Sequence, residues 1–187
     1  TISGNTRTQD EVIRREIGIT EGGLYSRSIL KKSLESLRRL GYFSDVQIST
    51  SEVEGMSDKI DINFNVEETQ TGSISFSMSH SNNYGVSFGA GIQEKNIFGS
   101  GNTLNADLKI AKSYNKVSFY FMNPNFNDEG HSVSIGAFKS EIDNDDVAAN
   151  SYEIDSTGVT FGYGLPLSDN TRINAGLEYS KNDIKCS

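Results

Sequence analysis

Residues suited to catalysis are few among the 187 of this chain. Its two histidines, His80 and His131, lie in strand-like stretches, and neither has a serine, cysteine or acid at the spacing of a nucleophile and its base. The single Cys186 cannot form an internal disulfide, and one cysteine leaves the redox compartment open. The sequence therefore predicts a protein that is not an enzyme, with no catalytic residues and no cofactor.

One acidic run resembles a calcium-binding loop in charge alone. It contains Glu141, Asp143, Asp145 and Asp146 but lacks the glycine and the terminal glutamate of that motif. The glycines within 88–93 lie inside an alternating stretch and open no helix, so they do not indicate a phosphate site. We expect a solvated loop and no protein metal site, with divalent ions that bridge the loop to lipopolysaccharide as the alternative.

From Gly72 onward, apolar residues alternate with small or polar ones. This period of two is typical of strands with one apolar and one polar face. The apolar sets are Ile74, Phe76 and Met78; Tyr84, Val86, Phe88, Ala90 and Ile92; Leu104, Ala106, Leu108 and Ile110; Val159, Phe161, Tyr163 and Leu165; and Ile173, Ala175, Leu177 and Tyr179. The pattern predicts seven strands, at about 73–80, 84–94, 102–112, 115–122, 131–140, 153–165 and 171–181.

Either lipid or a second protein layer could cover the apolar faces of these strands. A hydrophobic content of 35% and a mean hydropathy of −0.46 exclude a helical membrane protein. They do not exclude a transmembrane β-barrel, because the alternation of apolar and polar residues in its strands gives a low mean hydropathy. The polar positions are mostly serine and glycine, whereas a solvated sandwich face is usually richer in charged residues. We therefore favour lipid. The net charge of −8 argues against nucleic acid as a partner.

The first 70 residues follow a helical pattern and then an alternating one. Thr8 and Glu11 have the spacing of a capping box, which predicts a helix over 9–17. Ser26 and Gly41 have the residue types expected at the start and end of a second helix. Two strands should follow, at 46–48 and 60–66, and residues 1–3 read as the end of an earlier strand.

Several stretches, in order, identify a resemblance that spans the whole chain. They are LRRLGYFSDVQI at 37–48, a VEE tail that runs into GSISF, ISGNTRT at 2–8, NIFGSGN at 96–102 and MNPNF at 122–126. The chain resembles the BamA family of outer-membrane β-barrel assembly factors. The resemblance implies an α+β POTRA domain with a helix pair on a small mixed sheet, and then the first seven strands of an antiparallel transmembrane β-barrel.

The domain boundaries expected from this resemblance are 1–68 for the POTRA domain, 69–71 for a linker and 72–187 for the barrel part. Single-chain bacterial barrels have an even number of strands, eight or more, so seven cannot close and the chain is expected to be a fragment. The resemblance further implies a Gram-negative outer membrane location, with the POTRA domain in the periplasm.

The resemblance implies a function in folding and inserting outer-membrane proteins. The first barrel strand offers three apolar side chains to lipid, against five in the next, and is therefore the less firmly anchored strand. Its exposed backbone could pair with a client strand; the alternative is an ordinary short strand. The predicted pairing edge consists of Gly72, Ser73, Ile74, Ser75, Phe76, Ser77, Met78, Ser79 and His80.

The partners implied are the outer-membrane bilayer, unfolded outer-membrane protein clients and accessory lipoproteins of the assembly complex. The resemblance places the lipoprotein contact around Glu21, with Arg14, Arg15 and Glu16 nearby; the alternative is a solvated helix face. Two other functions stay open. One is a two-partner-secretion transporter of the same superfamily, and the other is a soluble β-rich binding module.

Overall fold

The structure is a computed structural model that describes residues 1–82, 85–143, 152–168 and 171–186. It divides into two compact units. The first, called here the small domain, comprises Thr1–Thr71 together with Lys95–Gly101, and the second, called the large sheet, comprises Gly72–Glu94 and the residues from Asn102 onward. None of the helices in the described residues is long and apolar enough to span a membrane.

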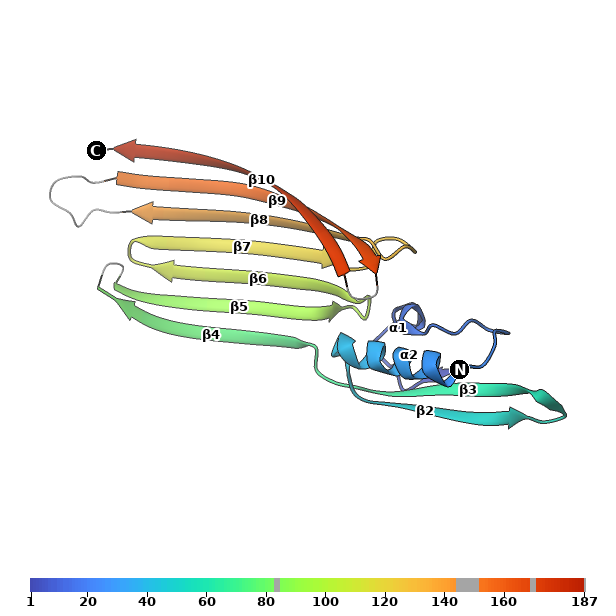
Figure 1. Cartoon of the computed structure of the whole chain (residues 1–187). Coiled ribbons are helices and arrows are strands. Elements are labelled where there is room, and N and C mark those ends of the chain that lie inside the picture. The colour runs from blue at the N-terminus through green and yellow to red at the C-terminus, as the bar shows by residue number, and fades with distance from the viewer. Residues whose placement is uncertain (83–84, 144–151, 169–170, 187) are drawn as a thin grey trace. The chain divides into compact units, whose positions relative to one another are not determined.

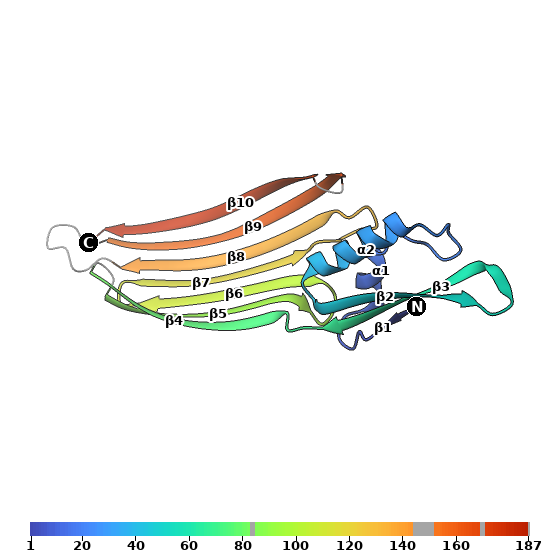
Figure 2. The same cartoon turned by 60° about the horizontal axis from the view of Figure 1, so that its bottom comes forward.

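The small domain contains a three-stranded mixed sheet and two helices (Figure 1). Its elements are β1 (Ile2–Ser3), α1 (Asp10–Glu16), α2 (Arg27–Leu40), β2 (Phe43–Val53) and β3 (Met56–Glu68). The strand order is β1-β3-β2, with β1 parallel and β2 antiparallel to β3 (Figure 2). The predicted helix pair, the two strands and the strand end at residues 1–3 are all present. The strands are longer than predicted.

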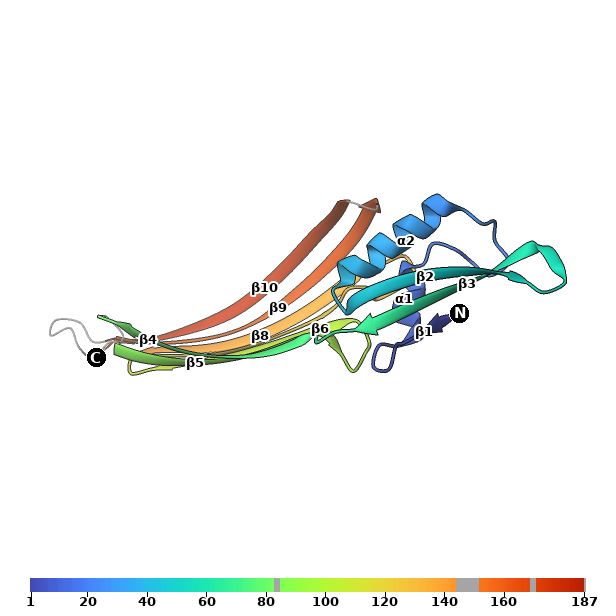
Figure 3. The ribbon, with the colours of Figure 1, turned by 90° about the horizontal axis from the view of Figure 1, so that it is seen from below.

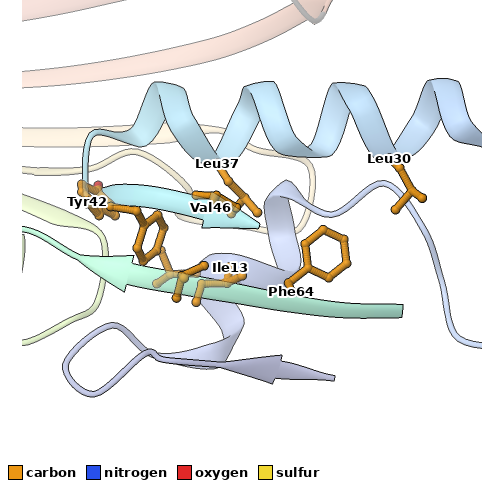
Figure 4. Packing of buried hydrophobic residues seen from close by; sticks show 9 residues of the cluster. Ile13, Leu30, Leu37, Tyr42, Val46 and Phe64 are labelled. Carbon is orange, nitrogen blue, oxygen red and sulfur yellow. The ribbon is translucent and has the colours of Figure 1, made fainter. Parts of the chain in front are cut away.

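The core of the small domain lies between its helices and its sheet (Figure 4). Ile13 of α1 and Leu37 of α2 are fully buried, and both meet Val46 of β2 and Phe64 of β3 in one apolar cluster. Leu30 and Leu37 are the buried leucines of α2, and they lie seven residues apart, which is two helical turns. Helical periodicity thus explains which side of α2 faces the sheet.

The helix ends agree with the sequence in part. Gly41 ends α2 in the left-handed conformation with a φ of 70°, as predicted. The predicted capping box at Thr8 is wrong, because Gln9 is the N-cap of α1 and the Thr8 hydroxyl accepts a hydrogen bond from Asn96 instead. Ser26 is the N-cap of α2, but its hydroxyl bonds to that of Ser28 and makes no side-chain cap.

The large sheet contains seven described strands, as predicted. They are β4 (Gly72–Ser81), β5 (Gly85–Ile97), β6 (Asn102–Ala111), β7 (Tyr114–Asn123), β8 (Ser132–Asp143), β9 (Tyr152–Ser168) and β10 (Thr171–Cys186). Each strand neighbours the one before it in sequence, so the order is β10-β9-β8-β7-β6-β5-β4 and the sheet is open, with β4 and β10 at its edges (Figure 1). The strands bend along their length (Figure 3).

The two faces of the large sheet differ as the alternation predicts. Apolar side chains on one face are widely exposed: Phe76 is 82% exposed, Leu177 77% and Val159 52%. A second sheet in a sandwich would bury these side chains, and among the described residues none does so. The other face is lined by serines and glycines in close contact, such as Ser134 over Gly162. Tyr84, Asp145 and Asp146 lie outside the described residues.

Candidate strand-pairing edge and docking surface

All nine residues of the predicted pairing edge lie in β4, which is an edge strand of the large sheet. β4 pairs with β5 along its whole length, from Gly72 opposite Glu94 to Ser81 opposite Gly85. In the described part of the chain, β5 is the only strand that β4 pairs with. The second side of β4 therefore presents backbone N–H and C=O groups in the spacing that another strand requires.

The apolar side chains of β4 are more exposed than those of the neighbouring strand. Ile74, Phe76 and Met78 are 67%, 82% and 73% exposed, whereas Val86 and Phe88 of β5 are 47% and 58% exposed. Each side chain of an edge strand has neighbours on one side only, which explains the difference. Within the described residues, β4 shares this exposure with β10, the other edge strand, whose Leu177 and Tyr179 are 77% and 72% exposed.

The polar face of β4 is a row of serines that fits against small residues of β5. A Cβ on Gly89 would collide with the Ser77 hydroxyl, and one on Gly91 would lie 2.9 Å from the Ser75 hydroxyl oxygen. The hydroxyls of Ser79 and Ser87 are 2.6 Å apart and share a hydrogen bond. From Ser75 to Ser79, the polar face of β4 and its partner residues in β5 thus carry only small side chains, and the contacts between these two strands come from backbone and hydroxyl groups.

The predicted docking residues lie on α1 and in the loop that follows it. The Arg14 guanidinium donates to the Glu21 carboxylate at 3.2 Å, and the two side chains are 54% and 91% exposed. Burial raises the pKa of Glu16, although the guanidiniums of Arg15 and Arg39 act to lower it. The structure thus brings Arg14 and Glu21 together and leaves Glu16 partly buried.

An exposed leucine beside this ion pair was not predicted. Leu24 is 93% exposed in the loop between the helices, three residues after Glu21. The neighbouring Tyr25 is 43% exposed. Leu24 and Tyr25 thus place two exposed apolar side chains in the same loop as Glu21. The signal in the sequence was the apolar pair directly after Gly22 and Gly23.

Glu68, at the end of β3, organises a loop that sequence reasoning did not single out. Its carboxylate accepts hydrogen bonds from the backbone N–H groups of Thr6, Arg7 and Thr8, at 3.1, 3.0 and 2.6 Å, and from the Thr6 hydroxyl at 2.7 Å. Its side chain is only 8% exposed. Burial acts to raise the pKa of Glu68, but the hydrogen bonds from Thr6, Thr8 and Arg7 outweigh it and lower the pKa to about 2.

His131 has two partners that the sequence did not predict. Its Nδ1 lies 2.6 Å from the Tyr163 hydroxyl of β9, and its Nε2 lies 3.2 Å from the Glu129 carboxylate. These contacts fasten the segment before β8 to β9. His80 lies opposite Val86 in the register of β4 and β5. Within the described ranges, no three His, Cys, Asp or Glu side chains are grouped to hold a metal ion.

Two family models match the chain. Residues 1–69 match the POTRA model, described as a surface antigen variable number repeat, and residues 96–186 match the Omp85 superfamily domain. The small domain and the large sheet have the folds that these matches lead one to expect. The chain therefore joins a POTRA domain to part of an Omp85 barrel domain and belongs to the Omp85 superfamily.

Within this superfamily, the chain is similar to BamA proteins. It is 30% identical over 94% of its length to the outer membrane protein assembly factor BamA of Neisseria meningitidis serogroup B, and 32% identical over 97% to that of Buchnera aphidicola. It spans 22% and 30% of the length of these two relatives. The predicted resemblance is thereby confirmed.

Two solved structures have the same fold as this chain. The crystal structure of BamA from Haemophilus ducreyi lacking POTRA domains 1–3 superimposes with a TM-score of 0.81 at 28% identity, over 98% of this chain and 35% of that one. CdiB from Acinetobacter baumannii matches with a TM-score of 0.65 at 13% identity, over 99% of this chain and 38% of that one, which shows a shared fold alone.

Proposed function

We propose that this chain is the junction between periplasmic domain and barrel of an outer-membrane protein assembly factor. The small domain lies in the periplasm, and the exposed apolar face of the large sheet contacts lipid. The chain acts through strand pairing and membrane insertion, without enzymatic chemistry. The observation that carries this proposal is the exposed apolar face of the large sheet, to which β4 contributes Ile74, Phe76 and Met78, in a chain similar to BamA proteins over nearly its whole length.

The physical reason is the cost of an unpaired strand edge in lipid. Each unsatisfied backbone group in hydrocarbon costs several kcal/mol, so a client strand that pairs with β4 is strongly favoured over an open edge. Pairing through backbone groups tolerates many client sequences, which suits a machine with many substrates. Ile74, Phe76 and Met78 of β4 lie on the apolar face that lipid covers in this proposal.

Cysteine trapping tests this proposal. In the full-length protein that contains this chain, with Cys186→Ser as background, Ser75→Cys and Ser77→Cys in β4 should form disulfides with cysteines in a client's terminal strand. The matched controls are Ser118→Cys in β7 and Ser134→Cys in β8, in the interior of the sheet. We expect at least tenfold more trapped client at β4, measured on non-reducing gels. Equal trapping at β7 and β8 would rule out β4 as the templating edge.

The surface around Glu21 docks an accessory lipoprotein of the complex. Support comes from the exposed Arg14–Glu21 ion pair, the adjoining Arg15 and Glu16, and the bare Leu24 beside them. Such a charge pair contributes only about 0–1 kcal/mol to folding, so its place on the surface is better explained by recognition of a partner than by stability.

Charge reversal tests the docking surface. Glu21→Lys should reduce copurification of the accessory lipoprotein at least fivefold, because it places a third positive charge beside Arg14 and Arg15, while the melting temperature of the protein stays unchanged. Glu35→Lys, at an exposed position of α2, is the matched control and should leave the complex intact. Complexes of normal composition with Glu21→Lys would exclude this docking role.

The second candidate function is export of a polypeptide through the barrel, which the sequence left open; the fold shared with CdiB fits either function. In a transporter of that kind, client segments pass through the lumen and do not pair with β4. The trapping experiment separates the two functions, because export predicts crosslinks at Ser118→Cys and Ser134→Cys as well as at the β4 positions, whereas strand pairing predicts crosslinks at β4 alone.

A further inference from the structure

The turn between β5 and β6 is part of the small domain. Residues Lys95–Gly101, called here the turn latch, pack with that domain although they connect two strands of the large sheet. The Lys95 N–H donates to the Thr71 carbonyl at 3.3 Å, and the Gln9 N–H, at the start of α1, donates to the Gly99 carbonyl at 2.9 Å. The Tyr42 hydroxyl donates to the Gly101 carbonyl at 3.3 Å.

Asn96 is the centre of this arrangement. Its side-chain amide donates to the Thr8 hydroxyl at 2.9 Å, and its carbonyl oxygen accepts from the Gly101 N–H at 2.7 Å. Asn96 is only 8% exposed and Thr8 only 4%. One buried side chain therefore both closes the turn and joins it to the segment before α1. Loss of this amide would leave buried polar groups without partners.

Two glycines let the turn latch approach the small domain closely. Gly99 has a φ of 71°, and a Cβ at this position would collide with the Arg7 carbonyl. Gly101 has a φ of 73°, and its Cβ would lie 3.3 Å from a Val12 methyl group of α1. The backbone conformation therefore favours glycine at both positions, and at Gly99 the contact with the Arg7 carbonyl requires it.

Phe98 lies between these contacts in a strained conformation. Its φ is 53°, the only positive value of a residue other than glycine in the described part of the chain. A bulky side chain in this region is a genuine outlier that costs free energy. The ring is 90% exposed, so little burial of the ring compensates for the strain. The hydrogen bonds at Asn96 and Gly99 must therefore impose this conformation on Phe98.

We propose that the turn latch is a releasable connection, closed by the hydrogen bonds of Asn96 and weakened by the strain at Phe98. Hydrogen bonds dominate its contacts, and water can replace most of them when the latch opens. The strain at Phe98 is relieved on opening. Release separates the turn latch from Thr8, Gln9 and Tyr42 of the small domain. This inference does not depend on the proposed function.

Hydrogen exchange of the full-length protein in lipid nanodiscs tests the latch without any client. Exchange at the Gln9 amide reports opening, because its acceptor is Gly99, while the Phe64 amide, bonded to the Thr1 carbonyl, reports the integrity of the small domain. Asn96→Ala should speed exchange at Gln9 at least tenfold and leave Phe64 unchanged. Thr8→Val removes the same hydrogen bond from the other side and should act in the same direction. Unchanged exchange at Gln9, or equal acceleration at Phe64, overturns the latch.

Two variants of Phe98 test the strain. Asparagine adopts the left-handed conformation more readily than phenylalanine, so Phe98→Asn should slow exchange at Gln9 three- to tenfold. Phe98→Ala is the matched control, because it removes the ring but keeps a Cβ on the strained backbone, and should change exchange less than twofold. If Phe98→Ala slows exchange as much as Phe98→Asn, the ring and not the backbone controls opening, and the proposal fails.

Discussion

Replacing Glu68 with glutamine should lower the free energy of unfolding of the small domain by about 3 kcal/mol. Glu68 accepts three backbone hydrogen bonds and one from the Thr6 hydroxyl, and the loss of one or two hydrogen bonds to a charged group costs about 1.5–3 kcal/mol each. Glutamine keeps the size of the side chain but has one carbonyl oxygen in place of two carboxylate oxygens, so some of the N–H groups of residues 6–8 lose their partner.

Denaturant unfolding followed by near-ultraviolet circular dichroism measures this loss. Glu67→Gln is the matched control, because Glu67 is the adjacent, exposed residue, and it should change the free energy by less than about 0.5 kcal/mol. Equal effects of the two substitutions would show that the hydrogen bonds of Glu68 do not stabilise the domain.

The pKa of Glu68 adds a pH dependence with a defined sign. Its pKa is lowered from 4.5 to about 2 in the folded domain, so the unfolded chain binds the proton more readily. The stabilisation is therefore complete above about pH 4.5 and is lost as the pH falls toward 2. Burial raises the pKa of Glu16, which acts in the opposite direction. The difference in the free energy of unfolding between the parent protein and Glu68→Gln, measured across this pH range, isolates the contribution of Glu68. This difference should shrink as the pH falls.

The contacts that decide the local structure around Thr8 explain why its predicted capping box is wrong. Thr8 and Glu11 have the right spacing, but the N–H of Thr8 donates to Glu68 and its hydroxyl accepts from Asn96. These partners lie 60 and 88 residues away in sequence. Capping rules consider neighbours within one helical turn and cannot include such partners. At Gly41, where the turn itself decides the conformation, the prediction is confirmed.

The large sheet was predictable because its pattern is set by a single physical requirement. Strands with one apolar face must alternate, so seven strands could be read from residues such as Phe76, Leu108 and Phe161. Alternation does not reveal which side chains the fold brings together. Neither Glu68 nor Asn96 stood out in the sequence as a site residue, since a buried glutamate or asparagine is recognised only when its hydrogen-bond partners are known. Arg14 and Glu21, seven residues apart, were singled out by the family resemblance, and their ion pair could not be read from the sequence pattern.

The apolar face of the large sheet can be tested directly by placing a charge on it. Phe161 lies in the middle of β9 between Ile135 and Leu177 and is 49% exposed. If this face contacts hydrocarbon, Phe161→Lys should cost about 2–4 kcal/mol, the range for lysine near the bilayer midplane. At 1.4 kcal/mol for each factor of ten, the equilibrium for folding into the membrane should fall roughly 30- to 1000-fold.

Thr160→Lys is the matched control, one residue earlier and on the opposite face. Thr160 lies opposite Gly136 and Glu178, so a lysine there meets small and acidic neighbours and should cost less than about 1 kcal/mol. Folding of the full-length protein into lipid vesicles, followed by its heat-dependent mobility on gels, measures both variants. A sheet whose apolar face were covered by protein in water would fold without lipid. Equal tolerance of both lysines would therefore contradict the membrane contact on which strand insertion depends. Folding that requires lipid and is lost only in Phe161→Lys means that hydrocarbon, and not a second protein layer, covers the apolar face of the sheet.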